Sequence, residues 1–219
     1  MSARLSFHEE LEKLHQNLLK MGTMVEEAIH LSVKSLADRN EDLALQVIHH
    51  DDEIDGLYLD LEKECFRLIA LQQPMAGDLR RIATVLKVVT DLERMADHAV
   101  SIAKATVRLK NEQYVKPLID IPKMAGLAQS MVRDALKAYI DQDLPKCYQI
   151  GKEDHQVDAL YKEIYNELIG IMKEKPDTVN QGTQFLFVAH YLERIGDHAT
   201  NLAEWVIYLV TGKLEELND

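Results

Sequence analysis

The chain has 219 residues and a formal net charge of −12, with 47% apolar residues but only nine glycines and five prolines. So few turn-forming residues argue against an all-β protein, and the acidic balance excludes a nucleic-acid surface, which needs a basic face to neutralise phosphates. No window approaches 18 uncharged apolar residues and the N-terminus lacks an apolar secretory stretch. We therefore expect a cytoplasmic protein that reaches a membrane only through partners.

Apolar residues recur at spacings of three and four along nearly the whole chain, which is the period of an amphipathic helix. Short polar turns interrupt this pattern. Pro74 marks one of them, because proline disfavours helical geometry in the residue before it. The longest predicted loop covers about residues 111–120 and separates two groups of three helices. The six helices are expected over roughly residues 7–36, 41–71, 75–109, 122–140, 144–173 and 179–211.

A twelve-residue passage occurs twice, reading LERMADHAVSIA over residues 92–103 and LERIGDHATNLA over 192–203. Core packing explains repeated apolar residues, but not the same acid, base, acid and histidine in the same order. A shift of 103 also places Met21 on Met124 and Tyr58 on Tyr161. The sequence therefore predicts an all-α fold: six long helices form two tandem, internally duplicated three-helix bundles over residues 1–112 and 113–219.

Both halves carry pairs of acidic residues four positions apart, which places each pair on one face of a helix. One pair lies in each repeated passage, and another lies upstream, in IHHDDEIDGLY and in GKEDHQVDALY. Consecutive helices pack side by side, so we expect two carboxylate clusters. They comprise Asp51, Asp55, Glu93 and Asp97 in the first half, and Asp154, Asp158, Glu193 and Asp197 in the second.

Carboxylates that converge beside apolar surface repel one another and lose hydration unless a positive charge compensates. Their pKa values rise, or Arg94 and Arg194 pair with them, or cations fill the space between them. An all-oxygen ligand set suits hard cations such as magnesium, calcium, manganese or iron. His98 and His198 lie about 100° around the helix from the second acid, and we expect them to form hydrogen bonds rather than to bind metal.

These residues also carry a resemblance to the PhoU family of phosphate-uptake regulators. It rests on the duplicated ER-x-x-DH string, the two upstream acid pairs and the segment MAGDLRRIATVLKVVTDLERMADH, and it spans essentially the whole chain. The resemblance implies multinuclear metal clusters of iron or zinc at the two carboxylate sets. It also implies a negative regulator that acts between the ATPase of a phosphate ABC transporter and a phosphate-sensing membrane histidine kinase.

We therefore expect a non-enzymatic regulator that lowers phosphate uptake and starvation signalling, and we expect a homodimer. One alternative is a carboxylate-bridged di-metal enzyme of ferritin type. It is disfavoured because the histidine follows the glutamate by five residues, not by three as in Glu-x-x-His. Another is a metal-free helical scaffold with solvated acids. Cys65 and Cys147 are expected to be reduced core residues.

Overall fold

The structure is a computed structural model that describes residues 3–217, with side chains from residue 7 onward. It confirms the all-α fold, and the described residues form no strand. The predicted helix ends agree with the observed ones to within a few residues. The helices are α1 (Ala3–Asp38), α2 (Glu41–Gln72), α3 (Gly77–Leu109), α4 (Asp120–Asp141), α5 (Leu144–Glu174) and α6 (Val179–Thr211), with a short 3₁₀ turn, η1 (Pro176–Thr178), before α6.

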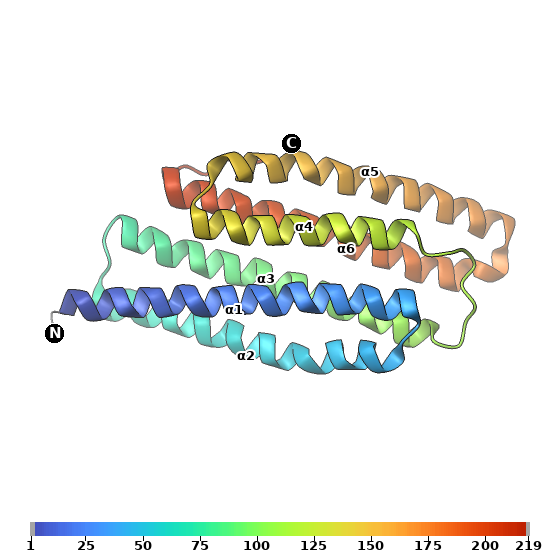
Figure 1. The fold of residues 1–219 in the computed structure, drawn as a ribbon, viewed down its shortest axis with the longest axis horizontal. Helices are drawn as coiled ribbons and strands as arrows, with labels where there is room; N and C mark the ends of the chain where they lie inside the picture. The colour runs from blue at the N-terminus through green and yellow to red at the C-terminus, as the bar shows by residue number, and fades with distance from the viewer. Residues whose placement is uncertain (1–2, 218–219) are drawn as a thin grey trace.

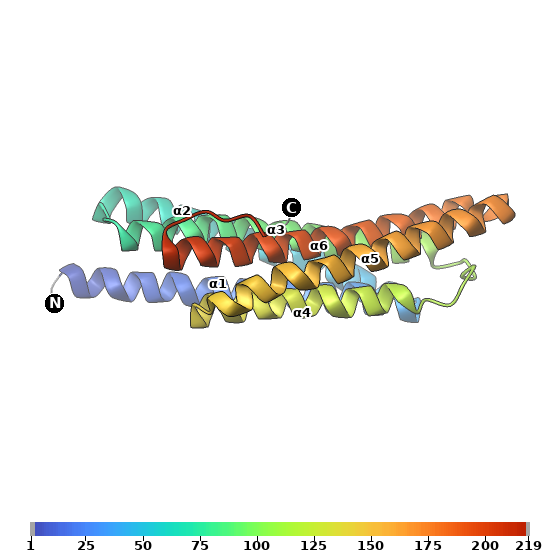
Figure 2. The same cartoon turned by 90° about the horizontal axis from the view of Figure 1, so that it is seen from above.

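The six helices form two three-helix bundles that lie side by side along their long axes (Figure 1). Within each half every helix contacts the other two, and the halves meet where α3 packs against α6 and α1 against α4. Figure 2 shows the same elongated arrangement from above. Each carboxylate pair therefore sits on a helix that neighbours the other pair of its own half.

The internal repeat extends to the backbone of the turns. Arg39 and Gln142, which are 103 residues apart, both adopt a left-handed conformation with φ of 53°. Each is followed by a helix-capping side chain: Asn40 accepts a hydrogen bond from the N–H of Leu43, and Asp143 accepts one from the N–H of Lys146. Such caps satisfy backbone donors that have no partner inside the helix. The α1–α2 and α4–α5 turns thus have the same left-handed residue and the same kind of side-chain cap.

Further contacts hold the halves together besides the α3–α6 contact. Gly22 of α1 faces α4, where an added Cβ would lie 2.7 Å from Leu136 Cδ1, so glycine allows these helices to approach closely. The connection between α3 and α4 is fastened by buried Gln181 of α6. Its Oε1 accepts from the N–H of Val115 at 2.6 Å, and its Nε2 donates to the carbonyl of Gln113 at 3.0 Å.

One apolar core runs through all six helices, and Cys65 and Cys147 are buried in it as free thiols, as expected. The first half also contains a small separate group, formed by Ala44 and Val47 of α2 with Val100 and Ala103 of α3. This group lies beside the main core, and Ala28 and Leu31 of α1 pack against it. No helix within residues 3–217 has the length and apolar character needed to cross a membrane.

Candidate carboxylate sites

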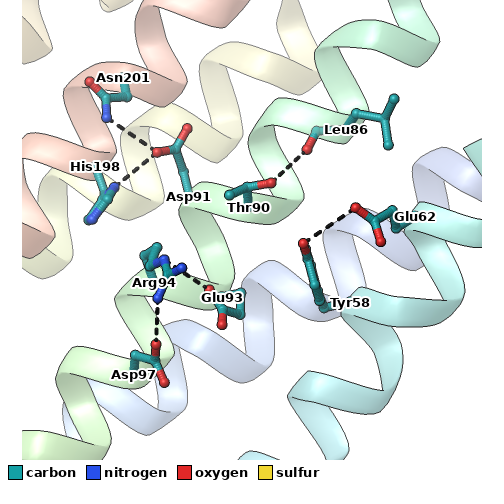
Figure 3. A network of polar contacts seen from close by, with 10 residues as sticks. All are labelled: Tyr58, Glu62, Leu86, Thr90, Asp91, Glu93, Arg94, Asp97, His198 and Asn201. Carbon is teal, nitrogen blue, oxygen red and sulfur yellow. Dashed lines mark hydrogen bonds and ion pairs between the residues drawn. The ribbon is translucent and has the colours of Figure 1, made fainter.

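The first site lies where α2 and α3 pack together. Asp51 of α2 and Glu93 and Asp97 of α3 are partly buried, while Asp55 is exposed. Arg94 lies between the two acids of α3 (Figure 3). Its Nη1 donates to Asp97 Oδ2 at 3.2 Å, and its Nε is 3.5 Å from Glu93 Oε2. In this arrangement, one arginine partly compensates the acids of α3.

The acids of the first site influence one another across the two helices. Burial raises the pKa of Asp51 to about 6, with further contributions from the charges of Asp55 and Asp97. Burial, followed by the Asp97 charge, also raises the pKa values of Asp55 and Glu93, the latter against the opposing effect of Arg94. The charges of these carboxylates therefore act on one another across α2 and α3, and a single guanidinium does not offset their repulsion.

The second site repeats this arrangement between α5 and α6. Arg194 Nη1 donates to Asp197 Oδ2 at 2.6 Å, and His190 Nδ1 lies 3.1 Å from Glu193 Oε2. Burial raises the pKa of both acids. The Asp197 charge adds to the effect on Glu193, while Arg194 opposes the effect on Asp197. His190 is a neighbour that the sequence comparison missed, because its counterpart in the first half is Thr90.

The two sites differ in how open they are. Asp154 is only 3% exposed, whereas its counterpart Asp51 is partly accessible. On α6, Gly196 leaves room for Asp154: an added Cβ would lie 3.0 Å from Asp154 Oδ1 and 3.8 Å from Met131 Cε. The first half has Ala96 at the equivalent position, so a methyl group occupies that space. The second site is therefore packed more tightly around its α5 acid Asp154 than the first site is around Asp51.

The donor set of both sites fits a hard cation, because it consists of carboxylates whose mutual repulsion a cation would relieve. In the described part of the chain, however, no three or more His, Cys, Asp or Glu side chains are already arranged to hold a metal ion. Arg94 and Arg194 pair with acids of α3 and α6 instead. Metal binding would require these pairs to open, and the eight predicted ligands remain a prediction.

A third polar cluster joins the two halves at the α3–α6 contact. Asp91 Oδ1 lies 2.9 Å from His198 Nδ1 and accepts from Asn201 Nδ2 at 3.2 Å (Figure 3). A shift of 100 residues relates Asp91 to Tyr191 and His198 to His98. The rings of Tyr191 and His98 stack, with their centroids 5.6 Å apart. Burial lowers the pKa of His98 to about 4, with a contribution from His198. Both histidines thus lie at the contact between halves, His198 beside Asp91 and His98 stacked on Tyr191.

With this geometry established, comparison with known proteins identifies the family. The PhoU domain family matches residues 18–106 and 121–206, one copy in each half. The chain belongs to the PhoU family. Its relatives include the phosphate-specific transport system accessory protein PhoU homolog of Clostridium acetobutylicum, which is 49% identical over 99% of both chains. The homologue of the same name from Streptococcus pneumoniae TIGR4 is 36% identical over 98% of this chain and 100% of its own length.

Solved PhoU structures share the whole fold. The crystal structure of PhoU from Pseudomonas aeruginosa superposes with a TM-score of 0.92 at 36% identity, covering 94% of this chain and 100% of that one. The phosphate transport system regulatory protein PhoU from Streptococcus pneumoniae superposes with a TM-score of 0.89 at 34% identity, covering 96% and 99%. These solved PhoU structures therefore share the tandem arrangement of two bundles described above.

Proposed function

We propose that this protein is a non-enzymatic negative regulator of phosphate uptake and of the phosphate-starvation response. Family membership and the names of the relatives, which are accessory and regulatory proteins of phosphate transport, support this role. The proposed partners are the ATPase of a phosphate ABC transporter and a phosphate-sensing membrane histidine kinase. We propose that the protein acts in the cytoplasm as a homodimer.

The proposed regulator binds a cation at each carboxylate site. The single observation that carries this is the partly buried acids on neighbouring helices in both halves, where burial and neighbouring charges raise the pKa of Asp51 to about 6 and also raise that of Glu193. A cation bound there would supply positive charge that stabilises the ionised carboxylates. Asp51 and Asp55 would hold it from α2, and Glu93 and Asp97 from α3. Their counterparts in the second half are Asp154, Asp158, Glu193 and Asp197, and iron or zinc is the proposed metal.

A merely structural protein has little use for two such sets, because crowded carboxylates beside aliphatic side chains weaken a bundle. The repulsion among these carboxylates therefore favours sites that bind a cation or a partner over a metal-free scaffold. A ferritin-type enzyme is disfavoured by the role of the histidines. His198 faces Asp91 across the contact between halves, and His98 stacks on Tyr191.

The test replaces Asp51, Asp55, Glu93 and Asp97 together by Asn or Gln, which keeps shape and removes the repulsion. We expect a folded variant that contains less metal and fails to repress, so that a phosphate-responsive reporter stays active in phosphate-rich medium. The control carries the same change at four exposed acids elsewhere: Asp42, Asp60, Glu163 and Glu174. Full repression by the folded, metal-depleted variant would show that the first site is dispensable for regulation.

A further inference from the structure

The first half contains a groove between α1 and α2 that the carboxylate chemistry does not account for. It has a volume of about 370 Å³, and its apolar floor is formed by Met24, Ala28 and Leu31 of α1 with Val47, Ile54 and Leu57 of α2. The lining residues run from Lys20 to Leu31 on α1 and from Gln46 to Leu57 on α2. At a rise of 1.5 Å per residue, each stretch is about 16 Å long, or three helical turns.

Comparison with the other half explains why the groove is open. Ala28 corresponds to Met131, whose longer side chain is fully buried and reaches to within 3.8 Å of the site that a Cβ on Gly196 would occupy. Leu31 corresponds to Asp134, which is engaged in an ion pair with Lys146 at 2.9 Å. The shorter Ala28 leaves space in the first half, at the level where a small group of apolar residues is separated from the main core.

The rim of the groove is acidic. Glu27, Asp51 and Glu53 stand along it against a single lysine, Lys20. This imbalance continues along the helix: α2 contains nine acidic and two basic residues, whereas its counterpart α5 contains six and four. The free carboxylates of Glu27 and Glu53 are solvent-exposed and belong to neither proposed metal site. The groove thus combines apolar side chains below with negative charge above.

We propose that this groove binds a basic, amphipathic helical segment of a partner protein. A third helix laid along α1 and α2 would bury apolar side chains at spacings of three, four and seven over three turns, and Lys or Arg side chains beside them would pair with Glu27 and Glu53. A second copy of this chain is a poor occupant. Its most basic helix, α3, with six basic and four acidic residues, is already packed against α1, α2 and α6.

This inference rests on the proposed function only in that a regulator must contact a partner. Because Asp51 lines the groove and also belongs to the first carboxylate site, partner binding and cation binding would meet at one residue. The groove proposal can be tested without that link, since Ala28, Glu27 and Glu53 lie outside both proposed ligand sets.

The experiment introduces a photo-crosslinking amino acid at Gln46, on the groove, and in a matched protein at Gln149, its exposed counterpart in the second half. The cross-linked segment is identified by mass spectrometry in cells grown with ample phosphate. We expect a segment of positive net charge and helical apolar periodicity at Gln46 and not at Gln149. The product should be lost in the Ala28→Met variant, which places a longer side chain at a residue that lines the groove. No groove-dependent product, an acidic or non-amphipathic segment, or a segment of this same chain would each overturn the proposal.

A second measurement covers the case in which Ala28→Met disturbs folding. A fluorescent synthetic peptide with the sequence of the cross-linked segment is titrated with purified full-length variants by anisotropy. Glu53→Lys should weaken its binding at least about tenfold, whereas Gln156→Lys, at the equivalent exposed position of the second half, should leave the affinity unchanged. Equal affinities of these two variants would overturn the acidic rim as a recognition element. Peptide binding without any effect of groove variants on the phosphate reporter would instead contradict the proposed function and leave the groove in place.

Discussion

Asp91 of α3 makes a buried polar contact between the two halves. The residue is only 9% exposed, and one oxygen of its carboxylate is contacted by both His198 and Asn201 of the opposite half. Two polar groups of α6 therefore depend on a single acid of α3. In the internal repeat the position of Asp91 is taken by Tyr191, so the contact between halves is polar on one side of the pseudo-symmetry and aromatic on the other.

The first prediction follows from this dependence. Asp91→Ala leaves His198 Nδ1 and the Asn201 amide without their buried partner, which should lower the free energy of unfolding by about 1–3 kcal/mol. Urea denaturation should show a lower midpoint with an unchanged slope. Asp60→Ala, at an exposed position of α2, serves as the control and should keep the wild-type midpoint. A wild-type midpoint for Asp91→Ala would mean that water replaces the lost acceptor.

The second prediction concerns pH and the metal-free protein. The folded-state pKa of Asp51 is about 6, above the ordinary value of 3.8 for an aspartate, so between these pH values the folded state binds a proton that the unfolded state has lost. The free energy of unfolding should therefore fall as pH rises from about 4 to about 6, and level off above that range. Allowing for solvent screening at this partly exposed site, we expect Asp51 to contribute on the order of 1 kcal/mol.

Thermal melts in chelator between pH 4 and 8 check this expectation. Asp51→Asn should reduce the fall in stability between pH 4 and 6 and leave the protein more stable than wild type at pH 7. Asp60→Asn should follow the wild-type curve, because that residue is exposed on the same helix. Parallel curves for wild type and Asp51→Asn would show that Asp51 is well solvated.

At the scale of residues, the sequence predicted some features of the sites and missed others, for physical reasons. The internal repeat singled out the eight acids that are proposed as ligands, because similar residues at matched positions are visible without a structure. It could not show that Asp154 is buried while Asp51 is only partly buried, since that depends on the space that Gly196 leaves for Asp154. Asp91 escaped notice because the two copies differ there. The groove depends on the size of Ala28, which has meaning only once its neighbours are known.

At the scale of elements, the helices and their turns were largely readable from the sequence. Periodicity fixed the helices, and proline and polar residues marked their ends. The equivalence of the capping residues Asn40 and Asp143 adds a physical reason for the repeat. Each cap satisfies a backbone donor at the start of the helix that carries the upstream acid pair, α2 in one half and α5 in the other.

The third prediction tests these caps. Asn40→Ala and Asp143→Ala should each lower the free energy of unfolding by about 1 kcal/mol, because each leaves a helix-terminal N–H without its acceptor. The double variant should lose about 2 kcal/mol, since the caps belong to different halves and share no partner. Asn40→Ser and Asp143→Ser supply another oxygen acceptor and should restore most of the loss in urea denaturation. No difference between the Ala and Ser variants would remove capping as the cause.

At the scale of the whole molecule, the duplication gives two similar sites in one chain that differ in access. Each proposed site is built within one bundle, from α2 and α3 or from α5 and α6, so one can be emptied without dismantling the other. The repeat therefore provides its own internal control. The first site lies beside the groove, which Asp51 also lines.

The last prediction uses that control to test cation binding. A ligand that binds only the folded state stabilises it, by about 2.7 kcal/mol per site at a free concentration one hundred times the Kd. For a domain of this size, 1 kcal/mol corresponds to roughly 2–4 °C in melting temperature. Chelation should therefore lower the melting temperature of the wild-type protein.

Two double variants separate the sites. We expect half the metal content and a smaller chelator effect when Glu93→Ala is combined with Asp97→Ala, and the same result in the other half when Glu193→Ala is combined with Asp197→Ala. The combined variant should contain no metal and show no response to chelator. Elemental analysis decides the ligands: metal content unchanged in both double variants would remove these four acids from the ligand set, and the arginine pairs of Arg94 and Arg194 would then account for their compensation.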